Sequence, residues 1–279
     1  MKEKLANMSS FIAVVRNRLK IYISPVIEST GLVIHGFTTR GGGTSAGPYS
    51  SLNTAFNVGD EHDCVRKNRI LICRALGLEA DKIVAGKQVH GDRVQVVDNQ
   101  DQGRGAWAFE DALPDVDALV TDVPGLPLSS YYADCVPIFL FDPAHRVVAL
   151  AHAGWRGTVA RIGLKTLQKM SAIFRTDPKD CLAGIGPSIG PCCYEINQEV
   201  LDQIKCSFSY WTDLVVPVYP GKWLLDLWQA NYRTLVDAGL LENKIDKASI
   251  CTSCRNNLFF SYRAQGGTTG RMASLIMLK

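Results

Sequence analysis

Three short segments of the sequence each place a histidine or a cysteine beside small or polar residues at the end of a predicted strand. They are residues 87–91 (Lys-Gln-Val-His-Gly), 132–136 (Tyr-Ala-Asp-Cys-Val) and 151–157 (Ala-His-Ala-Gly-Trp-Arg-Gly). Two imidazoles and one thiolate, with a fourth position left open, form one of the known ligand sets of a catalytic zinc ion. Taken singly, each residue has a plainer interpretation, as a core histidine or a small buried cysteine. Taken together, His90, Cys135 and His152 predict one metal site that the fold must assemble.

The sequence around His152 adds an anion-binding signal. A continuously apolar run, Val147–Ala151, is typical of a strand buried on both faces, and Gly154, Arg156 and Gly157 follow it before a predicted helix. Backbone N–H groups at a helix N-terminus favour phosphate, and Arg156 could bind it through two hydrogen bonds. Arg40, beside the glycines at 41–43, is a second candidate, with a solvated turn residue as the equally acceptable alternative.

A second cysteine motif is Cys251-Thr252-Ser253-Cys254. A structural zinc site would need another close pair, and the adjacent Cys192 and Cys193 do not have such spacing. A redox motif would be expected at the start of a helix in a βαβ unit, which is not recognisable here. We therefore interpret Cys251 and Cys254 as buried structural cysteines.

The elements that must position these residues follow from hydrophobic periodicity. Helical patterns cover residues 64–76, 159–174, 195–204 and 224–238. Residues 98–111 are polar and contain glycines, and we interpret them as a long loop within the domain, called the polar excursion below. Runs rich in β-branched and aromatic residues predict strands at 20–23, 33–38, 94–97, 118–121, 137–141, 147–152 and 259–262. Strands and helices alternate without a strict βαβ rhythm, which predicts an α/β protein of the α+β type, with a mixed sheet, or two, covered by helices.

Composition narrows the class of protein. The chain has 279 residues, 47% of them hydrophobic, so it can bury a full core without a structural metal. A net charge of +3, from scattered charges, argues against a nucleic-acid partner, and no apolar run is long enough for a membrane span. Nine cysteines, an odd number, with no recognisable signal peptide, indicate a cytoplasmic protein.

Eight motifs along the chain resemble, in order, those of the YfiH/YlmD family, also called laccase-domain proteins or multicopper polyphenol oxidoreductases. They are residues 35–40 (His-Gly-Phe-Thr-Thr-Arg), 51–53 (Ser-Leu-Asn), 88–91 (Gln-Val-His-Gly), 133–135 (Ala-Asp-Cys), 151–157, 186–190 (Gly-Pro-Ser-Ile-Gly), 193–195 (Cys-Tyr-Glu) and 260–263 (Phe-Ser-Tyr-Arg). The match extends from about Gly31 to Arg271 and favours a single domain over residues 1–279.

The resemblance implies zinc at His90, Cys135 and His152, and a fold shared with bacterial cysteine deamidase toxins. It implies phosphorolysis of adenosine, inosine and methylthioadenosine, and hydrolytic deamination of adenosine, with purine nucleosides and phosphate as the partners. It also marks His35, Asn53 and Gln88 as contacts of the bound substrate; for His35 and Asn53 the alternative is hydrogen bonding within loops.

The family's laccase label can be judged on histidine count. Multicopper oxidation requires a blue-copper site and a trinuclear cluster, together on the order of ten histidines. This chain has five, which excludes a multicopper laccase. One copper ion in place of zinc, and with it a single-copper polyphenol oxidase, stays open because copper binds nitrogen and sulfur ligands more strongly than zinc does.

Deamination fits the predicted site better, because zinc with an open position lowers the pKa of bound water to about 7. A carboxylate must then move protons, and Asp134 is the candidate. In a regular strand Asp134 would point away from Cys135, whereas in a turn both could face the pocket. A cysteine hydrolase with Cys135 as nucleophile and His152 as base is the main alternative, and a non-catalytic zinc scaffold is the third.

Overall fold

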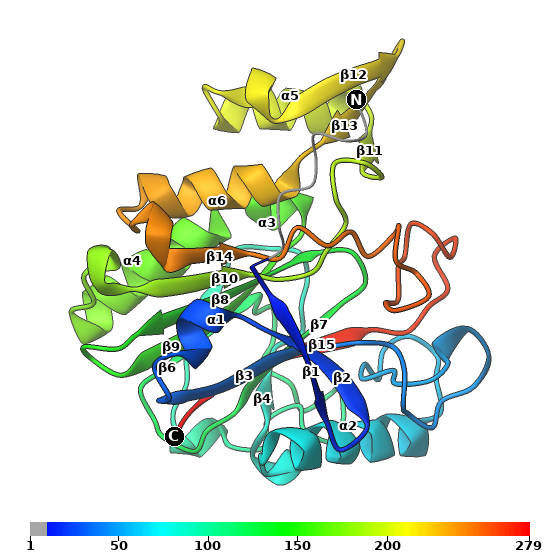
Figure 1. Ribbon diagram of the computed structural model, residues 1–279, viewed down its shortest axis with the longest axis vertical. Helices are drawn as coiled ribbons and strands as arrows, with labels where there is room; N and C mark the ends of the chain where they lie inside the picture. The colour runs from blue at the N-terminus through cyan, green and yellow to red at the C-terminus, as the bar shows by residue number, and fades with distance from the viewer. Residues whose placement is uncertain (1–9) are drawn as a thin grey trace.

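A computed structural model describes residues 10–279 of the chain, in which two six-stranded sheets lie face to face between helices (Figure 1). The first sheet has the order β1 (Ile12–Arg16), β2 (Leu19–Ile23), β3 (Val33–Thr38), β15 (Met272–Leu278), β7 (Leu128–Tyr132), β4 (Val84–Ala85). The second has the order β14 (Ile245–Lys247), β10 (Leu182–Ile185), β8 (Val136–Asp142), β9 (Val147–Ala153), β6 (Ala118–Thr121), β5 (Val94–Val96). The pairs β4–β7, β5–β6 and β10–β14 are parallel and the other pairs are antiparallel, so the predicted mixed sheets are confirmed.

Helices cover the outer faces, and a small sheet lies at one end. Helix α2 packs on the first sheet, and α3, α4 and α6 pack on the second. The small sheet has the order β11 (Glu195–Ile196), β13 (Lys222–Leu225), β12 (Val215–Tyr219) and lies beside α5 at the top of Figure 1. The helices are α1 (Pro25–Glu28), α2 (His62–Leu76), α3 (Trp155–Val159), α4 (Ile162–Phe174), α5 (Gln198–Ser207) and α6 (Leu227–Asp237).

Strand alternation divides the interior into three cores. Along β8, Val136, Ile138 and Leu140 face the helices, whereas Phe139 and Phe141 face the first sheet. Strand β9 follows the same rule, with its odd-numbered residues toward the helices and its even-numbered ones between the sheets. Because residue 152 is even-numbered, its imidazole lies on the inter-sheet side. The third core joins α2 to the outer face of the first sheet.

Six of the seven predicted strands are present, and the exception is residues 259–262. These residues form turns, although Phe259 and Phe260 are buried in the inter-sheet core. The backbone N–H groups of Phe260 and Ser261 donate to side chains rather than to a neighbouring strand, to Met272 Sδ and to Gln265 Oε1 respectively. The apolar pattern that predicted a strand at residues 259–262 therefore belongs to a buried loop.

Three predicted helices begin later than expected. Arg161 has left-handed backbone angles (φ 57°), which divides the predicted helix 159–174 into α3 and α4. Residues 195 and 224 belong instead to β11 and β13. Helices α5 and α6 start after Asn197 and Asp226, whose side chains accept N–H hydrogen bonds in the first turn.

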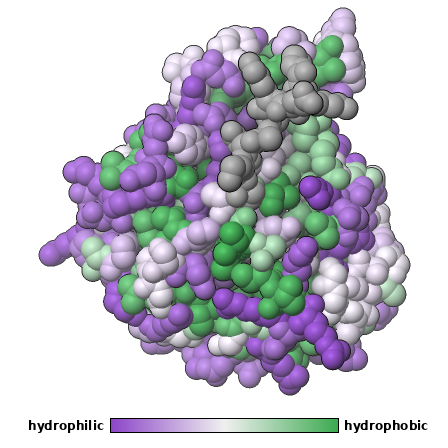
Figure 2. Space-filling model, viewed as in Figure 1, coloured by the Kyte–Doolittle hydropathy of each residue, from purple (hydrophilic) through white to green (hydrophobic). Residues whose placement is uncertain are grey.

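Among residues 10–279, no helix is long and apolar enough to cross a membrane. The face in Figure 2 is hydrophilic around much of its rim, with hydrophobic residues gathered near the middle. The edge strand β1 contributes to the exposed hydrophobic surface through Ile12 and Val15.

Candidate metal centre and pocket

The structure brings His90, Cys135 and His152 together, as the sequence predicted. Their ligand atoms all lie within 4.8 Å of one another. His90 comes from the loop after β4, where it has a left-handed backbone (φ 60°), Cys135 from the bend before β8, and His152 from β9. His90 is exposed, Cys135 half-buried and His152 buried, so one side of the cluster is open.

Asp117, which precedes β6, holds two of the three segments in place. Its carboxylate lies 2.8 Å from Nδ1 of His152 and accepts backbone N–H groups of Val89 (3.1 Å), His90 (3.1 Å) and Gly91 (2.8 Å). The bond to Nδ1 directs Nε2 of His152 to the cluster, which is the usual way a carboxylate orients a metal-binding histidine. The sequence reasoning missed Asp117, whose only local signal is a carboxylate at the start of a buried strand.

Cys135 and His152 are electrostatically matched. Burial by itself would raise the pKa of the Cys135 thiol, but His152 and His90 outweigh it and lower this pKa to about 6. Burial would likewise lower the pKa of His152, but Cys135 and Asp117 raise it to about 9. The protein therefore favours the thiolate form of Cys135, which is the form that binds a metal.

This donor set fits a zinc-type ion. It offers one sulfur and two nitrogen ligands from separate elements, with one imidazole anchored from behind by Asp117 and an open side. Gly154 makes room for the cluster: a Cβ atom there would lie 2.9 Å from Cδ2 of His90 and 3.2 Å from Sγ of Cys135. A side chain at position 154 would therefore displace the ligands.

The open side of the cluster faces a cavity of about 380 Å³. This volume is within the range of small-molecule sites. Aromatic side chains and arginines line the cavity together with the cluster: Phe56, Phe109, Tyr131, Tyr194 and Tyr262, and Arg69, Arg263 and Arg271. The arrangement can hold a flat, partly anionic ligand next to a metal ion.

Asp134 also lines the cavity, in a bend with φ 91° rather than in a strand. Its carboxylate accepts hydrogen bonds from Thr252 Oγ1 (2.6 Å), Ser261 Oγ (3.0 Å) and the Arg263 N–H (2.8 Å). The turn alternative is therefore the one that the backbone adopts, and the carboxylate connects the loops around Thr252 and Arg263 to the site.

The two arginines predicted to bind phosphate lie outside the cavity lining. Arg156 is exposed on the five-residue helix α3, with its guanidinium 4.4 Å from the Trp155 ring centroid. Arg40 donates to the carbonyls of Ser50 (3.0 Å) and Asn256 (2.8 Å) and stacks on Phe260. Arg40 thus connects loops.

Of the three predicted substrate contacts, Gln88 alone lines the cavity, where its amide bonds the N–H and carbonyl of Tyr131. His35 is buried in β3, where Nε2 accepts the Ser24 N–H (2.9 Å). Asn53 is buried as well and bonds Asp60 and the backbones of Ala55 and Arg271. For His35 and Asn53, these are the loop and backbone bonds that the alternative interpretation expected.

Three cavity arginines, Arg69, Arg263 and Arg271, were not predicted as site residues, although Arg263 belongs to the motif at 260–263. Arg69 had a usable signal, because Val65, Arg69, Ile72 and Leu76 share the buried face of α2. Its guanidinium lies between the rings of Phe56 (4.3 Å) and Tyr131 (4.4 Å). A charged residue on the apolar face of a helix indicates a role other than core packing.

The structure differs from the interpretation of Cys251 and Cys254 as buried cysteines, because Cys251 is buried but Cys254 is exposed. Cys192, Cys193, Cys251 and Cys254 form a second cluster, with all four sulfur atoms within 4.8 Å of one another. Spacing in the sequence failed as a guide because the topology, rather than a sequence motif, joins the two pairs. Within residues 10–279, no third cluster of this kind is present.

Fold and site together define an α/β protein with a candidate Cys/His metal site that opens into a cavity lined by aromatic side chains. The chain belongs to the family described as multi-copper polyphenol oxidoreductase laccase, whose model matches residues 34–279. The histidines outside the centre do not assemble a copper cluster: His35 is in β3, His62 packs on Phe56, and His145 pairs with Asp142.

Relatives and solved structures agree on this family. The chain is 40% identical over 244 residues to the purine nucleoside phosphorylase YlmD of Geobacillus stearothermophilus, covering 87% of this chain and 89% of the relative. It is 37% identical to adenosine deaminase RL5 from an unknown prokaryotic organism, covering 84% and 89%. The crystal structure of YlmD from G. stearothermophilus superposes with a TM-score of 0.92 at 37% identity, covering 97% and 99% of the two chains.

Proposed function

We propose that this protein is a zinc-dependent purine nucleoside enzyme, which cleaves adenosine, inosine and methylthioadenosine with phosphate and also deaminates adenosine hydrolytically. The observation that carries the proposal is the Cys/His centre at the wall of a cavity lined by aromatic rings and arginines. The names of the relatives, purine nucleoside phosphorylase and adenosine deaminase, support the same substrate class.

The cavity residues divide the work of binding such a substrate. Aromatic rings such as Tyr131, Tyr194 and Tyr262 offer faces against which a purine can stack. Arg271 is the candidate for phosphate, because its positive charge lines the cavity and lies near Cys135, beside the Cys/His cluster. Nη1 of Arg271 donates to the carbonyls of Thr269 and Gly270, which fixes the guanidinium and leaves its other N–H groups for an anion.

His90, Cys135 and His152 would hold the zinc ion. A bound zinc ion supplies a Lewis acid and lowers the pKa of coordinated water to about 7. Asp117 keeps His152 oriented, and Asp134 is the one carboxylate among the cavity-lining residues. We assign proton transfer during deamination to Asp134, because a group with this role must lie beside both the metal centre and the substrate.

The experiment uses metal-replete protein with adenosine, in the presence and absence of phosphate. Free adenine with phosphate, and inosine without it, are the expected products. Neither product from protein with confirmed zinc would contradict the proposal. Asp134→Asn should lower kcat for inosine formation more than it changes zinc content, and equal losses of both would assign Asp134 a structural role.

The position of the phosphate site is tested by a set of arginine variants. Arg271→Met should raise KM for phosphate at least 10-fold, with a smaller effect on phosphate-independent deamination. Arg156→Ala and Arg40→Ala are the matched comparisons, because these residues lie outside the cavity lining. A rise in phosphate KM confined to Arg156→Ala would instead place the anion at the start of α3.

A cysteine hydrolase is the second candidate, and one observation favours it. Cys135, His152 and Asp117 form a relay in which the carboxylate bonds Nδ1 of the imidazole at 2.8 Å and the imidazole lowers the pKa of the thiol. This function predicts that chelated protein stays active and that iodoacetamide inactivates it. The zinc proposal predicts that chelation abolishes activity and that added zinc restores it. Oxidation of phenols by protein loaded with copper alone would favour the single-copper oxidase instead.

We infer a cytoplasmic location from the cysteines. All nine are unpaired in the structure, which suits a reducing compartment.

A further inference from the structure

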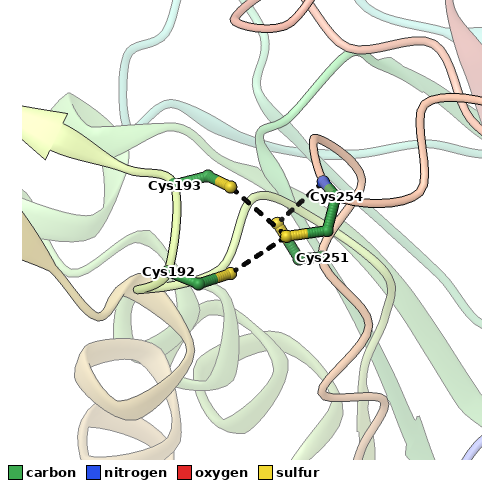
Figure 3. Close-up of side chains that lie close together, drawn as sticks. All are labelled: Cys192, Cys193, Cys251 and Cys254. Atoms are coloured by element: carbon green, nitrogen blue, oxygen red, sulfur yellow. Dashed lines mark hydrogen bonds between the residues drawn. The ribbon is translucent and has the colours of Figure 1, made fainter. Parts of the chain in front are cut away.

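Four cysteines from two distant turns converge at a place that the proposed function does not use. Cys192 and Cys193 come from the turn between β10 and β11, and Cys251 and Cys254 from the turn after β14. Figure 3 shows the four side chains pointing toward a common centre. Sγ of Cys254 lies 3.4 Å from Sγ of Cys192 and 3.4 Å from Sγ of Cys193.

The backbone around the cluster is built to hold these turns together. The N–H of Ser188 donates to Ile250 O (3.2 Å), and the N–H of Thr252 donates to Ser188 O (3.0 Å). Gly190 permits the close approach, since a Cβ there would lie 3.2 Å from the Cβ of Cys251 and 2.6 Å from the Trp228 ring. The two turns are therefore in register before any ligand is considered.

Two backbone groups donate to one of the sulfur atoms. The N–H of Gly190 lies 3.2 Å from Sγ of Cys251, and the N–H of Cys254 lies 3.4 Å from the same atom. Such bonds favour the thiolate over the thiol, because an N–H group interacts more strongly with a charged acceptor. A buried cysteine that served only for packing would not require two donors.

We propose that Cys192, Cys193, Cys251 and Cys254 bind one zinc ion through four thiolates. In a tetrahedral site with Zn–S bonds of about 2.3 Å, neighbouring sulfur atoms are about 3.8 Å apart. Two of the sulfur–sulfur distances are 3.4 Å and none exceeds 4.8 Å, and the tetrahedral value lies between these two figures. Four soft ligands in this arrangement select zinc or iron, and the absence of an open position makes the site structural.

The bound ion would fix one wall of the nucleoside cavity. Ile189 and Tyr194, on either side of the Cys192–Cys193 pair, both line the cavity. Arg263, another lining residue, donates to the carbonyls of Cys193 (3.2 Å) and Glu195 (2.9 Å). Thr252, inside the other cysteine pair, donates to Asp134. Loss of the ion should therefore loosen the cavity while the Cys/His centre keeps its own ligands.

The first measurement is the number of zinc ions per chain in full-length protein that has been exchanged into metal-free buffer. It is determined by elemental mass spectrometry. Wild type should hold two equivalents, and Cys254→Ser and Cys192→Ser should each lose one. His152→Ala should lose the other, so failure of the Cys/His centre and failure of the cysteine site are distinguishable. Cys206→Ser, an exposed cysteine outside the cluster, is the matched control and should keep both.

The second measurement identifies the ligands. Cobalt-substituted His152→Ala protein should show intense thiolate-to-cobalt absorption, which Cys254→Ser and Cys192→Ser should each remove from that background. Unchanged zinc content in both serine variants, when each has a wild-type circular dichroism spectrum, overturns the proposal. A disulfide among these four cysteines in freshly purified protein, or iron in place of zinc, overturns it as well.

Discussion

Asp117 connects the two histidines of the Cys/His centre through different atoms. It orients the imidazole of His152 directly, and it positions His90 by binding three consecutive backbone N–H groups of the loop at 89–91. One buried carboxylate therefore supports two ligands from segments far apart in the chain. Its pKa is lowered: burial alone would raise it, but the bonds from His152 and the loop outweigh that effect.

Asp117→Ala should weaken zinc binding about 10- to 100-fold, as is usual when a partner behind a metal-binding histidine is removed. The measurement is competition with a chelator of known affinity. Asp115→Asn, at an exposed turn position two residues away, is the control and should bind zinc like wild type. Unchanged affinity in Asp117→Ala would show that the ligands are positioned without the carboxylate.

His35 gives the protein a pH-dependent stability unrelated to the metal centre. Burial lowers its pKa from 6.5 to about 4, and Nε2 accepts the Ser24 N–H, a bond that protonation of Nε2 would remove. The unfolded chain takes up this proton at a higher pH than the folded protein does. The contribution of neutral His35 to the free energy of unfolding is therefore fully present above pH 6.5. This contribution, about 3 kcal/mol, is lost as the pH falls from 6.5 to 4.

His35→Gln removes this titration and retains a hydrogen-bond acceptor. The free energy of urea unfolding, measured at about pH 7 and about pH 4.5, should fall less in the variant than in wild type. Using the difference between the two proteins cancels the carboxylates that also titrate in this range. Equal falls would mean that the folded protein binds the His35 proton as readily as the unfolded chain.

Helix α2 reaches the cavity through a single side chain. Arg69 donates to the carbonyls of Thr54 (2.8 Å), Gly105 (2.6 Å) and Ala106 (2.9 Å) and is stacked between two rings. The helix thereby ties the loop at 52–57 and the polar excursion at 98–111 to the first sheet. Both loops contribute residues to the cavity lining.

Arg69→Met should destabilise the protein by about 2–4 kcal/mol, because three carbonyl oxygens lose a charged donor at once. Arg66→Met, on the exposed face of the same helix, should change stability by no more than about 0.5 kcal/mol. Denaturant unfolding of the two variants and wild type gives both values. Similar effects at the two positions would show that solvent replaces Arg69 readily.

The elements that could be predicted from the sequence are those whose pattern is local. Val147–Ala151 predicted a buried strand because both faces of β9 are covered, and the spacing of apolar residues predicted α2. The prediction of a strand at residues 259–262 was wrong because a buried loop has the same composition as a strand. One partner of this loop, Asp134, bonds Ser261 from more than a hundred residues away. The cysteine cluster could not be predicted for the same reason. Its two cysteine pairs are brought together by the pairing of β10 with β14, about sixty residues apart in the chain.

The site was predicted at the residues that carry unusual chemistry and missed at those that do not. His90, Cys135 and His152 stand out by residue type, so their convergence could be expected before the fold was known. Arg263 and Arg271 are ordinary surface residue types, and only the folded loops bring them to the cavity. The phosphate-binding role of Arg271, like those of Arg40 and Arg156, stays a prediction.

The two large sheets are interleaved along the chain. The first takes strands from residues 12–38, 84–85, 128–132 and 272–278, and the second takes strands from the intervening segments. Strand β15 lies between β3 and β7 and all seven of its residues are buried. No single cut in the chain separates one sheet from the other, which supports the single domain proposed for residues 1–279.

This interleaving predicts one cooperative unfolding transition. Tryptophan fluorescence and far-ultraviolet circular dichroism should give coincident urea midpoints, because the five tryptophans pack in or against the same cores as the two sheets. The experiment is run with saturating zinc and again with chelator, since bound metal shifts the midpoint by mass action. Both probes should shift together. An earlier transition of the part formed by α5 and the small sheet, seen only after chelation, would show that the four-cysteine turns hold a separately unfolding unit, and it would contradict the single domain.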